Sequence, residues 1–216
     1  MDLELRKYYA DRAKEYDRVY HLPDRQADLR ALEQWLPQQF VGARLLEIAC
    51  GTGYWTDFLA PVVDSLVGVD ASAETLAVAQ AKVKSPNVRF VVGDAYDIPF
   101  APGTFDAAFA GFWFSHVPRQ RQQEFLEGLN LALEPGSRLV LLDNFFAEVK
   151  SSPIVETDSY GNTFQARKLE NGAVHRVLKN FPDETALRGL VEGLGHDVAY
   201  RRFGYYWILE YRRNDP

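Results

Sequence analysis

The chain has 216 residues, with 24 Lys and Arg against 30 Asp and Glu and a formal net charge of −6. This length predicts one domain with a sizeable core, and the negative charge provides no general attraction to nucleic acid or to an anionic membrane. The single cysteine, Cys50, excludes an internal disulfide and a cysteine-rich zinc site. We therefore expect a cytoplasmic protein, a monomer or homodimer, without a metal, nucleic acid or membrane partner.

The first 38 residues predict two helices. The N-terminal stretch is charged and rich in tyrosine and lacks the apolar segment of a secretory signal. Tyr8 or Tyr9, together with Tyr16 and Tyr20, recur at spacings of four, seven or eight, which place them on one side of a helix over 3–20. A second helix over 24–36 has a leucine face and ends before Pro37.

Between residues 40 and 146, apolar strands alternate with helices. Ser72 is a plausible N-cap, and Pro118 suits the first turn of a helix. Strands that are apolar throughout and alternate with helices indicate a parallel sheet covered on both faces. The predicted strands are 43–49, 65–70, 87–93, 104–112 and 134–145, and the predicted helices are 54–60, 72–83 and 119–133.

This alternation stops at residues 147–181. Asn171 and Gly172 are a strong hairpin signal there, so we expect an inserted β-hairpin. A helix over 183–194 and an antiparallel strand pair, 196–203 and 205–212, follow. The sequence thus predicts a single α/β domain with a doubly wound, mostly parallel seven-stranded sheet and helices on both faces. Its segments are 1–38, 40–146, 147–181 and 182–216.

The segment LLEIACGTGYWTDFLA, residues 45–60, places Gly51 and Gly53 between the first strand and its helix. Glycines there permit a tight turn and let a ligand lie against bare backbone. The start of the helix offers N–H groups to an anion. Asp70, at the end of the second strand, can accept both hydroxyls of a ribose. These features alone fit a dinucleotide and a nucleoside equally well.

Three details separate the two ligands. Thr56 occupies the third glycine position of the dinucleotide fingerprint. Glu47 would repel a pyrophosphate but not a cationic ligand. Asp94 and Ala95 follow the third strand, where an adenine edge could be recognised. S-adenosylmethionine combines an adenosine, a carboxylate and a positive centre, and it matches all three details.

The sequence resembles the class I S-adenosylmethionine-dependent methyltransferases of small molecules. The resemblance spans about residues 40–145 and rests on five motifs in order: LLEIACGTGYWT, VGVDAS, VVGDAYDIPF, FDAAFAGFWFSHV and LEPGSRLVLLDNF. Ala49 stands where the family commonly has its first glycine. The resemblance implies a Rossmann-like methyltransferase fold with an antiparallel last strand. It also implies an enzyme that transfers a methyl group from S-adenosylmethionine to an oxygen or nitrogen of a small organic acceptor.

The resemblance also implies positions for the cofactor contacts. Phe112 would lie near the sulfonium, and an N-terminal helix carrying Tyr8 and Tyr16 would fold over the cofactor, where aromatic rings suit a cation. For the tyrosines, a purely structural place in the core is the alternative. Cys50 is expected to be a small neutral neighbour of the cofactor. The other implied contacts are Glu47, Ala49, Gly51 and Gly53 to the methionine part, Asp70 to the ribose, and Ala71, Asp94 and Ala95 to the adenine.

His116 and Asp143 are the candidate catalytic residues. Both follow strands at the carboxyl edge of the sheet, where open α/β sheets bind ligands, so they could form a base and the group that orients it. A surface histidine and a turn acid are the alternative. Some similar O-methyltransferases use a histidine and an acid at these places. The acceptor pocket is expected between the N-terminal helix and residues 147–181, with aromatic residues such as Trp113, Phe114, Phe164 and Trp207.

Two other functions stay open at this point. One is a non-catalytic S-adenosylmethionine-binding module that regulates a partner. The other is an NAD(P)-dependent oxidoreductase, which Thr56 and Glu47 disfavour.

Overall fold

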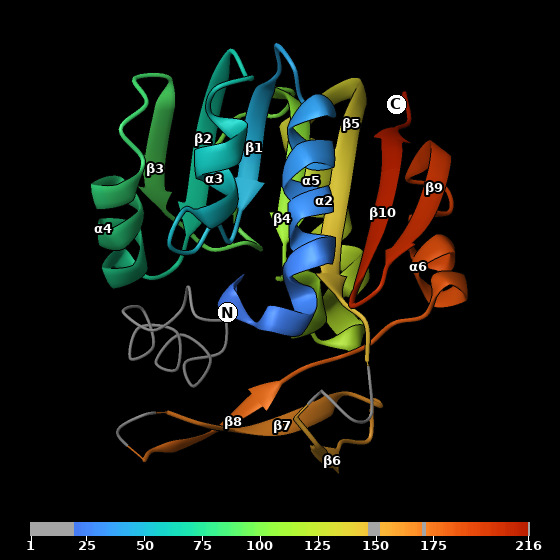
Figure 1. Ribbon diagram of the computed structural model, residues 1–216. Coiled ribbons are helices and arrows are strands. Elements are labelled where there is room, and N and C mark those ends of the chain that lie inside the picture. Colours follow the sequence, from blue (N-terminus) through green and yellow to red (C-terminus); the bar gives the residue numbers. More distant parts are fainter. Residues whose placement is uncertain (1–19, 147–151, 170–171, 216) are drawn as a thin grey trace.

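The computed structural model describes residues 20–146, 152–169 and 172–215. The predicted helix over 3–20, including Tyr8 and Tyr16, lies outside these residues apart from Tyr20. A seven-stranded sheet with the order β3-β2-β1-β4-β5-β10-β9 forms the centre of the molecule (Figure 1). Its strands are β1 (Arg44–Ile48), β2 (Ser65–Asp70), β3 (Val88–Val92), β4 (Phe105–Gly111), β5 (Leu133–Asn144), β9 (Gly195–Phe203) and β10 (Tyr206–Arg213).

The strand directions confirm the predicted fold class. Strands β1 to β5 pair in parallel, whereas β10 is antiparallel to both of its neighbours, β5 and β9. The last strand therefore lies inside the sheet and β9 forms the edge. None of the described helices is long and apolar enough to cross a membrane.

Helices cover both faces of the sheet (Figure 1). Because strand side chains alternate, Leu45 packs with α2 and α3 on one face while Leu46 packs with α5 and α6 on the other. Ser72 caps α4 as predicted, since its Oγ accepts the N–H of Thr75 at 3.1 Å. The helices are α2 (Gln26–Gln38), α3 (Tyr54–Leu59), α4 (Ala73–Lys82), α5 (Gln122–Ala132) and α6 (Glu184–Val191), with 3-10 turns η2 (Pro23–Arg25), η3 (Phe114–His116) and η4 (Arg119–Arg121).

The insertion contains one strand more than the predicted hairpin. It is a separate antiparallel sheet of β6 (Ile154–Thr157), β7 (Thr163–Lys168) and β8 (Val174–Leu178). The additional reversal occurs because Asp158 Oδ1 accepts the N–H groups of Tyr160 and Asn162 at 2.9 and 2.8 Å. In Figure 1 this small sheet lies beneath the carboxyl ends of the parallel strands, where it borders the expected site.

Candidate active site

The loop after β1 is built from left-handed backbone. Ala49, Gly51 and Gly53 have φ values of 53°, 57° and 74°. A Cβ on Gly53 would lie 3.1 Å from Ala79 Cβ, so glycine lets the loop pack closely on α4. The position of Ala49 explains why the family pattern commonly has glycine there, because an L side chain is strained at this φ.

Ala49→Gly is expected to stabilise the protein by about 0.5–1 kcal/mol, because relief of left-handed strain outweighs the added entropy of the unfolded chain. Thermal or urea unfolding measures this change. Ala166→Gly, on the exposed face of β7, is the matched control and should destabilise. A loss of stability in both variants would contradict the strain at Ala49.

Asp70 lies at the carboxyl end of β2 with its carboxylate against the loop. Its Oδ2 accepts the N–H of Gly51 at 3.0 Å and its Oδ1 accepts the N–H of Ser72 at 2.9 Å. Burial raises the pKa of Asp70, and these backbone hydrogen bonds oppose the shift. The carboxylate is thus fixed in direction at the end of the strand.

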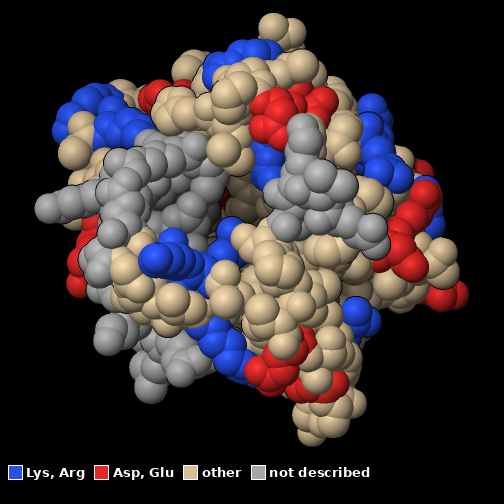
Figure 2. All heavy atoms as spheres, turned by 60° about the horizontal axis from the view of Figure 1, so that its bottom comes forward, with Lys and Arg blue, Asp and Glu red and all other residues tan. Residues whose placement is uncertain are grey.

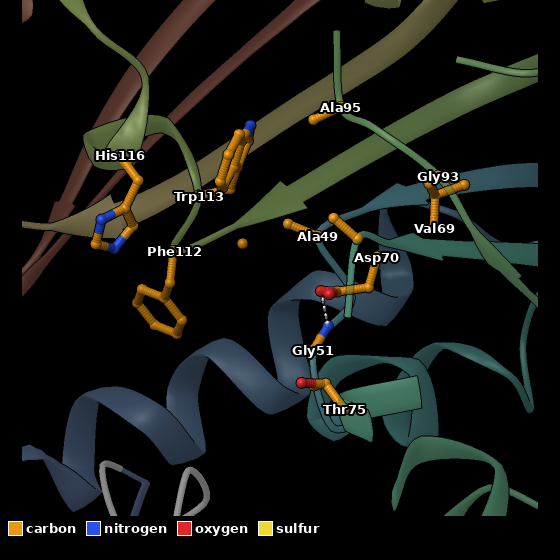
Figure 3. Close-up of a pocket in the computed structure, with 12 residues that line it drawn as sticks. Ala49, Gly51, Val69, Asp70, Thr75, Gly93, Ala95, Phe112, Trp113 and His116 are labelled. Atoms are coloured by element: carbon orange, nitrogen blue, oxygen red, sulfur yellow. Dashed lines mark hydrogen bonds between the residues drawn. The ribbon is translucent and has the colours of Figure 1, made fainter. Parts of the chain in front are cut away.

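A cavity with about 570 Å³ of empty space, including its open mouth, lies beside this carboxylate (Figure 3). Asp70 and Gly51 stand at one end and Phe112, Trp113 and His116 at the other. Such a volume suits a small-molecule ligand. Six of the twelve lining residues have no side chain beyond Cβ, which leaves room for a flat ligand against the backbone: Ala49, Gly51, Ala71, Gly93, Ala95 and Gly111.

Four predicted contact residues lie outside the cavity lining: Glu47, Cys50, Gly53 and Asp94. Glu47 is 1% exposed and accepts a hydrogen bond from Thr56 Oγ1 at 2.6 Å. Burial raises the pKa of Glu47 to about 8, so the carboxyl is mostly protonated at neutral pH. Burial likewise raises the pKa of the Cys50 thiol well above its ordinary value, which keeps it neutral as expected.

His116 ends the η3 turn and lines the cavity. Its Nδ1 lies 2.6 Å from the carbonyl oxygen of Leu178 in β8. A carbonyl oxygen only accepts, so Nδ1 carries the proton and Nε2 carries the lone pair. Burial lowers the pKa of His116, and the charge on Lys179 lowers it further. The imidazole is therefore neutral, and its lowered pKa makes Nε2 a weaker base than that of an ordinary histidine.

Asp143 is fully buried and has Lys179 as its ion-pair partner. Lys179 Nζ donates to Asp143 Oδ1 at 3.0 Å and to Ser115 Oγ at 2.5 Å. Asp143 Oδ2 accepts the N–H of Ser115 at 2.8 Å. Burial alone would raise the pKa of Asp143, but the charge of Lys179, the neighbouring His116 and the hydrogen bonds from the N–H groups of Ser115 and Asn144 together outweigh it and lower the pKa. The histidine is oriented by the Leu178 carbonyl, and Asp143 supports the η3 turn that carries it.

The sequence analysis did not identify Lys179, and it assigned several aromatic residues to the acceptor pocket only as a group. Trp113 lines the cavity, and its buried Nε1 has no hydrogen-bond partner among the described residues. Phe114 and Trp207 are instead buried in the core between the sheet and α5. Lys179 follows apolar Val177 and Leu178, and a cation after such a run was the available signal for a buried partner. No group of three metal-binding side chains occurs among the described residues.

Comparison with known proteins decides the family. A family model described as a methyltransferase domain matches residues 45–136. The demethylmenaquinone methyltransferase of Staphylococcus epidermidis strain RP62A is 31% identical over an alignment of 179 residues, and the match covers 75% of this chain and 71% of that protein. The chain belongs to the S-adenosylmethionine-dependent methyltransferases.

Solved structures support this assignment. The complex of DhpI with SAH has a TM-score of 0.81 and 27% identity, covering 99% of this chain and 97% of that one. The DhpI–SAM–HEP complex has a TM-score of 0.77 and 28% identity, covering 99% of both chains. The class I methyltransferase family, its fold and its S-adenosylmethionine cofactor are therefore confirmed. So is methyl transfer to a small-molecule acceptor, which sets aside the oxidoreductase and the non-catalytic module.

Proposed function

We propose that this methyltransferase methylates an oxygen or nitrogen atom of its acceptor, with His116 as the group that takes up the proton. The observation that carries the proposal is the neutral imidazole at the cavity, tied at Nδ1 to the Leu178 carbonyl. We place the acceptor between the cavity and residues 147–181. The aromatic wall and the net charge of −6 favour a small organic acceptor over nucleic acid.

The residues around the cavity suit S-adenosylmethionine. In the proposal Asp70 accepts the ribose hydroxyls, while Ala71 and Ala95 leave space for the adenine. Phe112 lies at the same end as His116 and presents an aromatic ring to a sulfonium. Ala49 and Gly51 expose backbone toward the methionine part. Contacts from the other candidates stay predictions: Tyr8, Tyr16, Glu47, Cys50, Gly53 and Asp94.

When bound, S-adenosylmethionine supplies a methyl group whose bond to sulfur breaks, with the electron pair going to sulfur, as the acceptor's lone pair bonds to the methyl carbon. The cavity walls align the acceptor with this axis and exclude water. An acceptor hydroxyl or amine then loses its proton to His116 Nε2. The Leu178 carbonyl holds the imidazole in the tautomer that this transfer needs.

The segment and cellular assignments follow from the same proposal. Residues 40–146 hold the cofactor, residues 1–38 and 147–181 form the acceptor side, and residues 182–216 close the sheet. We infer a cytoplasmic enzyme that works as a monomer or homodimer. The single buried cysteine supports a reducing compartment.

Labelled S-adenosylmethionine and a metabolite extract, followed by mass spectrometry, test the proposal. The reaction should label one class of metabolite at oxygen or nitrogen. Demethylmenaquinone is included as a separate acceptor because the staphylococcal relative is named for it. A label on carbon or sulfur would contradict the proposed atom.

His116→Gln is expected to lower kcat about 100-fold or more while leaving the affinity for S-adenosylmethionine unchanged. His196→Gln, at an exposed position in β9, is the matched control. Because burial lowers the pKa of His116, the imidazole is protonated only below its ordinary range, so kcat should stay level from pH 8 to pH 6. Normal turnover in His116→Gln would remove His116 from the mechanism.

A further inference from the structure

We propose that the acceptor carries an anionic group, a carboxylate, phosphate or phosphonate, and that Arg25 and Arg167 bind this group beside His116. The inference rests on the proposed acceptor site and names the chemistry of its substrate. The two arginines come from separate parts of the fold, Arg25 from the η2 turn and Arg167 from β7.

The small sheet directs Arg167 toward the seven-stranded domain. Side chains alternate along a strand, so Gln165 and Arg167 of β7 lie on the same face, opposite Val177 and His175 of β8. Gln165 is fully buried and Val177 belongs to the main core, so this face is turned inward. Lys179 continues the same face, because its N–H extends the ladder to the Thr163 carbonyl at 2.8 Å.

Arg25 occupies the other side, near the end of β5. Its Nη1 donates to Asn144 Oδ1 at 3.0 Å, one residue beyond Asp143. Its guanidinium lies 6.0 Å from the ring centre of Tyr206, which is 5.4 Å from the ring centre of the cavity residue Phe112. The Nε of Arg25 is buried and has no acceptor among the described residues. A ligand oxygen would satisfy this donor.

Neither arginine has a carboxylate partner among the described residues. Arg167 Nε and Nη2 both donate to the neutral amide oxygen of Gln165, at 3.1 and 2.5 Å. Lys179, by contrast, is already paired with Asp143. Two half-buried guanidinium groups in a chain of net charge −6 are therefore without a counterion within the described part.

A chain of hydrogen bonds joins Arg25 to Lys179. Asn144, which accepts from Arg25, donates its side-chain amide to Asp143 Oδ1 at 3.2 Å, and Lys179 Nζ donates to the same oxygen at 3.0 Å.

Burial is the main cause that lowers the pKa of Lys179. The negative charge of Asp143 opposes this shift, whereas the positive charges of Arg167 and Arg25 add to it. The positive charges of Lys179 and Arg167 likewise lower the pKa of His116. Figure 2 shows a hollow on this side of the molecule with basic atoms along its edge. Three cations against one carboxylate complement an oxyanion, and guanidinium forks bind such groups through paired hydrogen bonds.

Calorimetry on the protein saturated with S-adenosylhomocysteine tests the inference, with phenylphosphonate and benzoate as anionic probes and benzamide as the neutral probe. The anions should bind at least ten times more tightly than benzamide. Arg167→Met should raise the dissociation constants of the anions about tenfold and leave those of benzamide and S-adenosylhomocysteine unchanged. Arg25→Met should act in the same way.

Arg176→Met is the matched control. Arg176 is in β8 on the opposite face of the small sheet, paired with Glu156 at 2.7 Å, so its replacement should not change anion binding. Equal binding of benzoate, phenylphosphonate and benzamide would overturn the inference, as would equal effects of Arg167→Met and Arg176→Met. If a methionine variant does not fold, the anion dissociation constants are measured on Arg167→Lys, which keeps the charge.

The relative strength of the two anions separates a carboxylate from a phosphonate or phosphate. The metabolite experiment stays independent of this titration. A labelled product with no carboxylate, phosphate or phosphonate group, free or esterified, would overturn the anionic acceptor while leaving oxygen or nitrogen methylation intact. Anion binding together with a label on carbon would support the anionic acceptor and contradict methylation at oxygen or nitrogen.

Discussion

Asp70→Asn is expected to raise the dissociation constant of S-adenosylmethionine about 100-fold, because hydrogen bonds to a charged acceptor contribute about 1.5–3 kcal/mol each. The amide keeps only one acceptor oxygen. It would also turn an NH₂ group toward the N–H of Gly51 or Ser72, both of which the carboxylate now accepts. Titration calorimetry with S-adenosylmethionine measures the change, and the thermal midpoint establishes that the variant is folded.

Asp64→Asn is the matched control for this experiment. Asp64 is an exposed acid just before the other end of β2, so its replacement should leave affinity within twofold. Because the pKa of Asp70 is raised by burial, wild-type affinity should fall as the pH falls through that pKa and Asp70 becomes protonated. Asp70→Asn should lose this dependence. An unchanged dissociation constant in Asp70→Asn would remove Asp70 from the cofactor site.

Lys179→Met is expected to lower the free energy of unfolding by about 3–5 kcal/mol, because it leaves the carboxylate of Asp143 buried without its countercharge. Urea unfolding followed by tryptophan fluorescence measures this loss. The double variant Lys179→Met/Asp143→Asn should recover part of it, since the amide oxygen can still accept the N–H of Ser115.

Lys168→Met provides the control on the same small sheet. Lys168 is exposed, so its replacement should change the free energy of unfolding by less than about 0.5 kcal/mol. If Lys179→Met were no more destabilising than Lys168→Met, the buried ion pair would not contribute to stability. A double variant less stable than Lys179→Met would contradict the proposed cause.

The same network joins the small sheet to the turn that carries His116. Asn180 donates its N–H to the Ser115 carbonyl at 2.7 Å and its side-chain amide to the Val117 carbonyl at 3.1 Å. Asn162 accepts the N–H of Arg119 at 2.7 Å. These contacts hold the insertion against the turn that carries His116.

The amino-acid sequence by itself determined the elements that depend on neighbouring residues. The apolar runs, the glycines after β1 and the Ser72 cap act within a few positions of the chain. They predicted the seven-stranded sheet and brought the strand ends that carry Asp70, Asp143 and His116 to one edge. Parallel strands place their carboxyl ends together, so a motif at each end locates the cavity without knowledge of the packing.

Only the tertiary structure decided the chemical state and partners of these groups. Burial beneath the loop makes Glu47 mostly neutral, whereas its sequence position had suggested a charge facing the ligand. Asp143 forms an ion pair with Lys179, 36 residues away, and the sequence analysis had not identified this lysine. Desolvation and pairing depend on which distant segments fold against a site. The pattern of residues within one segment does not show which distant segment packs against it, because the same pattern is compatible with many partners.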